Sequence, residues 1–296
     1  MNVMKNLLFG IAMLSVAGLC ASCIGSNQQA QSSEAQEAAA ATCCYDTIEG
    51  VSAMTLKDGS QVIWLKDNAG DKLNSPDLFS DAPKSLIDSL GLAEGMPASI
   101  STFLLKTEGK TILFDAGLGP KMGGHMAERL ASIGLSTDSI DMIFLTHLHA
   151  DHIGGLMGEE GPLFADAEIY VGAVEYDAWM NQMTAEQAGL QQSIMGAYAD
   201  QLRQFAFGDT LPCGVVAIDA VGHTPGHTVF QKDELLVIGD LMHGLALQES
   251  HPEFCANFDM DKERSIESRK RILGYARDNG LVMAGMHMPA PGFVVR

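Results

Sequence analysis

Four residues of types that bind metal ions occur within six positions of the sequence: His147, His149, Asp151 and His152. They follow a short apolar run, 141–146, which predicts a buried strand with a functional tip. In an extended segment, His147 and His149 lie two positions apart and project to the same side. Imidazole nitrogens combined with a carboxylate oxygen suit Zn²⁺ or a similar divalent transition metal. The segment therefore predicts a metal site.

Three later glycine-rich segments carry the same residue types. They contain His223 and His227 within 222–227, Asp240 directly after Gly239, and His287 between Met286 and Met288. Together with the HxHxDH pattern at 147–152, this order resembles the signature of the metallo-β-lactamase superfamily, and the resemblance extends over roughly residues 50–292. Within that superfamily, the Gly239-Asp240-Leu241-Met242-His243 loop is most similar to the methyl parathion hydrolase and lactonase-like branch.

The resemblance implies a binuclear site with two divalent metal ions, for which Zn²⁺ is the expected metal. By position, one ion would be bound by His147, His149 and His223, the second by Asp151, His152 and His287, and both by a bridging Asp240. Two such ions about 3.5–4 Å apart lower the pKa of a bridging water from about 15.7 toward about 7, which creates hydroxide at neutral pH. Asp240, as the bridge, and Asp151, as a proton carrier to the leaving group, are the predicted catalytic carboxylates.

Supporting roles are expected for other side chains near these ligands, on the resemblance and on their residue types. Asp115 is expected to support the metal loop, and His227 is expected to make hydrogen bonds without binding a metal. His243 lies three residues after Asp240 and is expected to line the substrate pocket. The pair of carboxylates in Asp259-Met260-Asp261 is expected to cap a helix.

The pattern of apolar runs and turn residues predicts the elements that position these side chains. Two hairpins are followed by strands that end in His- and Gly-containing loops, and helices lie between them. The strands are expected at 51–56, 61–65, 100–105, 111–115, 141–146, 169–171, 215–220, 235–238 and 282–284, and the helices at 83–90, 126–133, 173–207 and 262–278. A break near Gly189 or Gly196 would divide 173–207 into two helices. The order of these elements predicts the fold class α/β, and the resemblance implies an αββα four-layer sandwich of the metallo-β-lactamase type.

The first 46 residues predict export and a tether. Residues 1–22 resemble a signal peptide, with Lys5 before an apolar run that is too short to span a bilayer comfortably. Cys23 follows two small residues as in a bacterial lipobox, so it is the expected lipidation site; ordinary cleavage near Ala21 is the alternative. Residues 23–46 have the composition of a flexible lipoprotein tether, and 47–296 would form the catalytic domain. The protein is expected either free in the periplasm or attached to a membrane, and the N-terminal lipid anchor is the only membrane contact that we expect.

Composition restricts the partners. The chain has 296 residues with 18 Lys and Arg against 37 Asp and Glu, a formal net charge of −19. Nucleic acids and anionic membrane surfaces need clustered basic residues, so neither is expected as the main partner. A small-molecule substrate is expected. The sequence leaves open the oligomeric state and whether Cys213 and Cys255 form a disulfide.

These observations predict an exported binuclear metallohydrolase that attacks an ester-like bond: a lactone, a carboxylic ester or a phosphotriester. A β-lactamase and a thiolester hydrolase of the same fold are the alternatives within enzymes. The former usually lacks a bridging aspartate, and the latter carries a further C-terminal helical domain. A zinc-binding, non-catalytic lipoprotein is the alternative from a different class; a complete ligand set with a bridging carboxylate favours catalysis over it.

Overall fold

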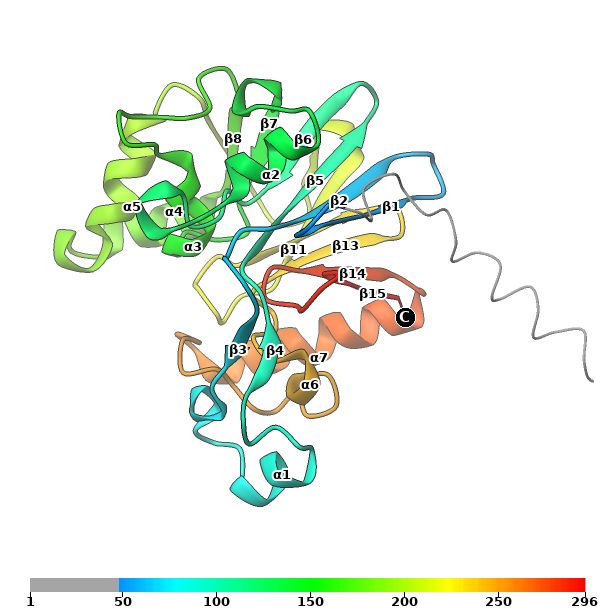
Figure 1. Ribbon diagram of the computed structural model, residues 1–296. Helices are drawn as coiled ribbons and strands as arrows, with labels where there is room; N and C mark the ends of the chain where they lie inside the picture. The colour runs from blue at the N-terminus through cyan, green and yellow to red at the C-terminus, as the bar shows by residue number, and fades with distance from the viewer. Residues whose placement is uncertain (1–47, 296) are drawn as a thin grey trace, which may run out of the picture. The chain divides into compact units, whose positions relative to one another are not determined.

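The computed structural model describes residues 48–295, and two β-sheets form the centre of this part of the chain (Figure 1). The first sheet has seven strands, in the spatial order β1 (Val51–Thr55), β2 (Gln61–Lys66), β5 (Ser101–Thr107), β6 (Lys110–Phe114), β7 (Met142–Phe144), β8 (Glu168–Gly172) and β9 (Leu202–Phe205). The second has six, in the order β10 (Thr210–Leu211), β11 (Val215–Asp219), β12 (Thr228–Lys232), β13 (Leu235–Gly239), β14 (Val282–Gly285) and β15 (Phe293–Val295).

The interior strands β2, β5, β6, β7, β13 and β14 are buried on both faces, which explains why they are largely continuous apolar runs rather than alternating ones. In β6, Ile112 and Phe114 face the second sheet and Leu113 faces the helices on the outside. Helices α2 (Met126–Ser132) and α5 (Ala185–Ala197) cover the outer face of the first sheet, and α7 (Lys262–Asp278) covers the second. The layers are therefore helix, sheet, sheet and helix, which confirms the predicted αββα sandwich.

Helix α7 has the bounds that its sequence predicts. The Asp261 side chain accepts a hydrogen bond from the Arg264 backbone N–H and thereby caps the first turn. The helix then buries Ile272 and Leu273 against the second sheet. Gly280, which has a positive φ of 60°, ends it in the left-handed region that glycine adopts without strain.

The prediction for 173–207 is wrong in part. Helix α4 (Ala173–Asp177) continues into a π-helical turn, Ala178–Gln182, and α5 then begins separately. Thr184 and Gln187 form a capping box that starts α5, so the main break precedes Gly189. A kink inside α5 at Ala188, where φ is −127° and ψ is 17°, lies beside the expected break at Gly189. The last part, expected to be helical, is β9, which pairs in parallel with β8.

Several short elements were not expected from the sequence. Strand β12 pairs with both β11 and β13, and its Thr228-Val229-Phe230 segment has the β-branched and aromatic residues typical of strands. Strands β3 (Lys72–Asn74) and β4 (Met96–Ala98) pair as a separate two-stranded antiparallel sheet, and Asn74 of β3 donates a hydrogen bond to the His243 carbonyl in the loop after β13. Of the remaining short helices, α1 (Lys84–Ser89) confirms the helix expected at 83–90, whereas α3 (Ala150–Ile153) and α6 (Leu245–Gln248) were not expected.

Three sequence predictions concern residues outside 48–295. The signal peptide at 1–22, the lipidation site at Cys23 and the tether at 23–46 all lie outside the described residues and stay predictions. Within the described part, no helix combines the length and the apolar character needed to cross a membrane. Cys213 and Cys255 are both free thiols, so the disulfide left open by the sequence is not formed in this structure.

Candidate metal centre

All seven predicted ligand residues come from loops that follow the carboxyl ends of strands. The loop after β7 and the short helix α3 carry His147, His149, Asp151 and His152, and the loops after β11, β13 and β14 carry His223, Asp240 and His287. Residues that are up to 140 positions apart in the sequence are thus brought to one edge of the sandwich, where their ligand atoms form overlapping groups within 4.8 Å.

The first group consists of three imidazoles and the Asp240 carboxylate. The His149 Nδ1 atom lies 3.0 Å from His147 Nε2 and 2.9 Å from His223 Nε2. Asp240 Oδ2 lies 3.2 Å from His223 Nε2 and 3.7 Å from His147 Nε2. Four potential ligand atoms therefore surround one point, with the histidine set that suits zinc.

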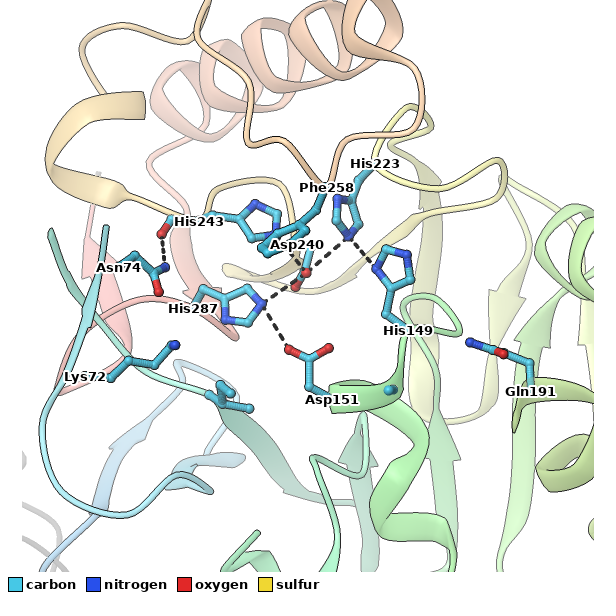
Figure 2. A pocket seen from close by; sticks show the side chains of 12 residues that line it. Lys72, Asn74, His149, Asp151, Gln191, His223, Asp240, His243, Phe258 and His287 are labelled. Atoms are coloured by element: carbon cyan, nitrogen blue, oxygen red, sulfur yellow. Dashed lines mark hydrogen bonds and ion pairs between the residues drawn. The ribbon is translucent and has the colours of Figure 1, made fainter. Parts of the chain in front are cut away.

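The second group shares Asp240 with the first. His152 Nε2 lies 3.1 Å from Asp240 Oδ1, and His287 Nε2 lies 3.1 Å from Asp240 Oδ2. Asp151 completes the group, because its Oδ2 is 3.6 Å from His287 Nε2 and its Oδ1 is 3.8 Å from His152 Nε2 (Figure 2). Asp240 is thus the one carboxylate of these seven residues that contacts both groups.

The hydrogen bonds around the centre show that it fits cations. His147 Nδ1 lies 3.0 Å from the Thr146 hydroxyl and His223 Nδ1 lies 2.9 Å from Asp259 Oδ1, so Nδ1 of each ring can donate there and Nε2 of each ring faces the centre. The two Nε2 atoms lie 3.0 Å and 2.9 Å from His149 Nδ1. His152 Nε2 and Asp240 Oδ1 are buried and have no hydrogen-bond partner. A bound metal cation would satisfy these two atoms, which otherwise stay buried and unpaired at a cost.

A second layer of contacts orients the ligands. Asp115 accepts hydrogen bonds from the Thr146 backbone N–H and hydroxyl and from His152 Nδ1, each at 2.7 Å. The contact predicted for Asp115 is therefore present. His287 Nδ1 donates to the Ser99 carbonyl at 3.0 Å. Such outer hydrogen bonds hold the ring orientation and make the inward nitrogen more basic.

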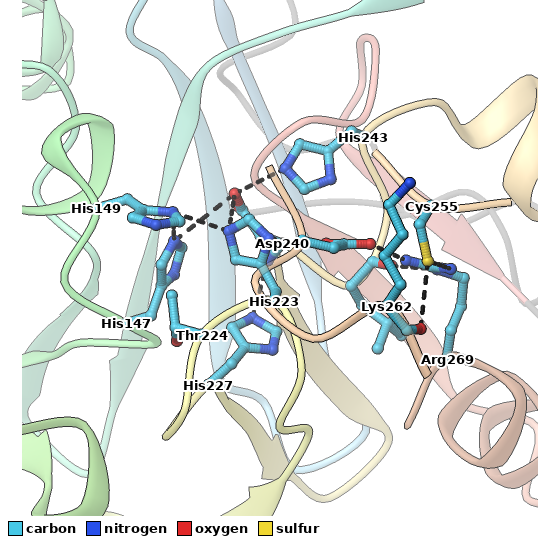
Figure 3. A network of polar contacts seen from close by, with 12 residues as sticks. His147, His149, His223, Thr224, His227, Asp240, His243, Cys255, Lys262 and Arg269 are labelled. Carbon is cyan, nitrogen blue, oxygen red and sulfur yellow. Dashed lines mark hydrogen bonds and ion pairs between the residues drawn. The ribbon is translucent and has the colours of Figure 1, made fainter. Parts of the chain in front are cut away.

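The prediction that Asp259 caps a helix is wrong, although Asp261 does so. Asp259 lies under the metal centre, where its Oδ1 accepts from His223 Nδ1 and its Oδ2 accepts from Arg269 at 3.0 Å. Arg269 is 1% exposed and also donates to the backbone carbonyls of Leu241, Pro252 and Phe254, beside the Cys255 thiol (Figure 3). A buried Arg269–Asp259–His223 chain therefore supports one ligand.

Glu175 is a further functional residue that the sequence analysis missed. Its buried carboxylate accepts four hydrogen bonds: from Leu148 N–H at 3.0 Å, Trp179 Nε1 at 2.7 Å, the Thr224 hydroxyl at 2.8 Å and Gly226 N–H at 2.7 Å. Leu148 belongs to the loop of His147 and His149, whereas Thr224 and Gly226 belong to the loop of His223. Glu175 thus joins two ligand loops, and no local sequence signal marks a single glutamate in a helical pattern as such a link.

The same cluster requires a glycine at its closest approach. A Cβ atom at position 226 would overlap the backbone of Glu175. Trp179, held by Glu175, in turn packs its ring edge-on against His149 with centroids 5.7 Å apart. The Gly226 contact and the Trp179 ring explain how the loops are held close to α4.

Burial and neighbouring charges set the protonation of the centre. Burial lowers the pKa of His149 to about 3. Burial also acts to lower the pKa of His223, but hydrogen bonds to Asp240 and Asp259 raise it to about 9. Burial opposes the ionisation of Asp240, yet His152 and His287 hold its pKa well below the usual value. Asp240 is therefore an anion among imidazoles, as a bridging ligand must be.

His243 lies between the centre and a pocket. Its Nε2 is 3.1 Å from Asp240 Oδ2, and its ring stacks on His287 with centroids 4.9 Å apart. The pocket is about 460 Å³ and is bordered by His243, Asp151 and Phe258 among others (Figure 2). The structure thus places His243 where the pocket prediction requires, and also close enough to Asp240 and His287 to bind a metal with them.

The other histidines have structural contacts. His227 Nε2 accepts a hydrogen bond from the Asp240 backbone N–H at 3.0 Å, while its Nδ1 donates to the Ala220 carbonyl. This agrees with its expected role. His125 and His251 lie near the surface, beside Glu128 and Glu253, away from the centre.

Comparison with known proteins identifies the family. Residues 95–275 match the family model described as the Metallo-beta-lactamase superfamily. Ribonuclease Z of Salinibacter ruber is 32% identical over 151 residues, which are 50% of this chain and 40% of that protein. Ribonuclease Z of Aeropyrum pernix is 44% identical over 50 residues, or 17% of this chain and 14% of that protein. The chain therefore spans less than half the length of these relatives.

Solved structures match over more of the chain. AidC, a dizinc quorum-quenching lactonase in complex with a product, is 26% identical with a TM-score of 0.75 and covers 83% of this chain and 93% of its own. AbOPH, a hydrolase in the beta lactamase superfamily, is 27% identical with a TM-score of 0.73 and covers 83% and 92%. With its family match over more than half its length and its converging cluster of histidines and aspartates, this chain belongs to the metallo-beta-lactamase superfamily.

Proposed function

We propose that this chain is a binuclear hydrolase that cleaves an ester-like bond in a small molecule, within the methyl parathion hydrolase and lactonase-like branch. The observation that carries the proposal is the position of Asp240 between the two ligand groups, beside a pocket into which Asp151 opens. The similarity to a dizinc lactonase and to AbOPH, both above 25% identity, supports the branch.

In this proposal the residues divide the work as their contacts suggest. His147, His149 and His223 would hold one divalent ion, Asp151, His152 and His287 would hold the other, and Asp240 would touch both; zinc is the proposed metal. Bound ions of this kind polarise the scissile bond and make water nucleophilic at neutral pH. The Asp151 side chain is 27% exposed, in contrast to the 3% of Asp240, so Asp151 can reach a substrate and pass a proton to its leaving group.

A nucleic-acid substrate is the alternative suggested by the ribonuclease Z relatives. The net charge of −19 argues against it, because binding a phosphate backbone requires clustered cations. A β-lactam or a thiolester would use the same metal centre, and they differ from lactones and esters only in what the pocket accepts.

One panel of assays tests the proposal. Protein stripped of metal and reloaded with zinc is tested on a lactone, an aryl ester, a phosphotriester, a β-lactam, a thiolester and a structured RNA. We expect about two ions per chain, turnover of at least one of the first three substrates, and loss of turnover on chelation. Two bound ions without turnover of any substrate would support the non-catalytic zinc protein instead, and cleavage of RNA alone would support a nuclease.

We also propose that the protein is exported and anchored through Cys23, as the first 22 residues suggest. Expressed in a bacterium, the wild-type chain should label with a lipid precursor and fractionate with membranes, whereas Cys23→Ser should be soluble. An N-terminus other than Cys23 on the mature wild-type protein would contradict the anchor.

A further inference from the structure

Lys72 is the one charged residue among those described around the pocket that does not belong to the histidine and aspartate cluster. The other lining residues outside that cluster are uncharged: Asn74, Ile100, Ala150, Gln191 and Phe258. Figure 2 shows the Lys72 side chain extending from the pocket wall toward the space in front of His287 and Asp151. A positive charge is therefore present beside the metal centre and is not part of it.

The position of Lys72 follows from the short two-stranded sheet of β3 and β4 that carries it. In β3, Lys72 and Asn74 are two residues apart and share one face, whereas Leu73 between them is 58% exposed on the other. The Asn74 side chain donates a 2.7 Å hydrogen bond to the His243 carbonyl. Because His243 belongs to the loop of Asp240, this bond joins β3 to the metal loop and directs the face of Lys72 toward the pocket.

Lys72 has no ion-pair partner among residues 48–295. The neighbouring Asp71 lies 3.6 Å from Lys66 instead. Asp151 and Asp240 face the histidines of the centre. The Lys72 ammonium group thus places a positive charge on the pocket wall, although the chain as a whole has a net charge of −19. Charges farther away than about 8 Å are largely screened at physiological salt, so the local charge governs what this part of the pocket attracts.

We infer that Lys72 binds a carboxylate carried by the substrate, so that the preferred substrate is an anionic ester or lactone. The inference rests on the proposed function and adds the substrate class to it. One ammonium group, which is a compact point charge, balances the single negative charge that a carboxylate carries at neutral pH. The Asn74 amide, already bonded to the His243 carbonyl, leaves Lys72 as the anion-binding group on this wall.

The test uses two esters of equal chain length and leaving group: neutral p-nitrophenyl hexanoate and anionic mono-p-nitrophenyl adipate. The ratio of kcat/KM for adipate over hexanoate should fall about tenfold in Lys72→Met, the size expected for losing one hydrogen bond to a charged group. Lys72→Glu should lower the ratio at least as far, and Lys72→Arg should keep most of it. Lys270→Met, which removes an exposed lysine of α7 outside the pocket, is the matched control and should leave the ratio unchanged.

A binding measurement separates this inference from the proposed function. Adipate monoamide, which resists hydrolysis, should bind the zinc-loaded protein more weakly in Lys72→Met than in wild type by calorimetry. Absence of turnover on both esters, with Lys72-dependent binding, would reject the ester hydrolase and keep the anion site. An unchanged kcat/KM ratio and unchanged binding in Lys72→Met would overturn the anion site. A larger loss on the matching ω-phosphono ester than on adipate would overturn the choice of carboxylate.

Discussion

The ligands of the metal centre differ in how the protein treats their charge. Burial keeps His149 neutral with a pKa of about 3, whereas two carboxylates raise the pKa of His223 to about 9. Asp240 is anionic and lies within 3.2 Å of nitrogen atoms from both ligand groups. Each of these residues therefore has a distinct expected response to mutation.

Asp240→Ala should remove the ligand shared by the two groups. We expect the second ion to bind poorly and kcat to fall by at least about 10²-fold, equivalent to about 2.7 kcal/mol. His243→Ala should keep two ions and change the selectivity among lactone, ester and phosphotriester substrates. Metal analysis and steady-state kinetics measure both variants. Two ions and near-normal kcat in Asp240→Ala would reject the bridging role, and loss of an ion in His243→Ala would make His243 a ligand.

Asp259→Asn should weaken metal binding, although Asp259 itself is not one of the proposed metal ligands. The amide cannot accept from both His223 and Arg269, because one of its two polar atoms is a donor, so the His223 ring loses its fixed orientation. Outer-layer changes of this kind typically cost 10–100-fold in metal affinity or activity. Asp261→Asn is the matched control, since asparagine caps helix α7 equally well. Competition with a chromogenic chelator gives the affinities; equal values for both variants would dismiss the supporting role.

The two sheets are linked to each other through contacts with the loops that carry the metal ligands. Glu175 in α4 contacts the loop after β7 in the first sheet and the loop after β11 in the second. Burial raises the pKa of Glu175, and the four donated hydrogen bonds oppose that rise. The relative position of His149 and His223 therefore depends on one carboxylate in a short helix.

Glu175→Ala should leave four donors without an acceptor, three of them on the ligand loops and the fourth on Trp179, which packs on His149. We expect a loss of about 2–4 kcal/mol in the free energy of unfolding. Zinc affinity should also fall, measured at a temperature where the variant is still folded. Glu186→Ala, an exposed glutamate in the first turn of α5, is the control and should change neither. A loss of stability with unchanged zinc affinity would show that Glu175 stabilises the fold but does not position the metal ligands.

For the whole molecule, folding and metal binding are coupled through the protonation of the centre. The raised pKa of His223 means that the metal-free protein holds a proton there at pH 7, although a metal ligand must be neutral. Binding should therefore expel this proton, and the apparent zinc affinity should rise with pH until about 9. The metal-loaded protein should also unfold at a higher temperature than the stripped protein, by mass action.

Calorimetric titration in two buffers of different ionisation enthalpy measures this proton release directly. About one proton released for the first ion at pH 7, and fewer near pH 9, is the expected result. Affinity that stays constant from pH 6 to 9 would show that His223 is already neutral in the metal-free protein.

The local parts of this protein could be predicted from its sequence because they depend on neighbours along the chain. The spacing of His147, His149 and Asp151 after a buried strand indicates a metal loop without reference to the rest of the fold. The α7 bounds follow from Asp261 at the start and Gly280 at the end, since caps act within one turn. The order of strands and helices indicated an α/β sandwich, and the four-layer arrangement was implied by the resemblance to the superfamily.

Only the tertiary structure decided what supports and surrounds the ligands. Asp259 lies 36 residues from His223, and Glu175 lies 51 residues from Gly226, and neither pair has a pattern along the chain. Asp259 is of a residue type that caps helices, and its role in supporting a ligand instead depends on where His223 lies after the sheets pack. The pocket face of Lys72 likewise depends on the Asn74 bond to a loop 169 residues away. Contacts of this kind are set by packing across the two sheets, which local spacing does not encode.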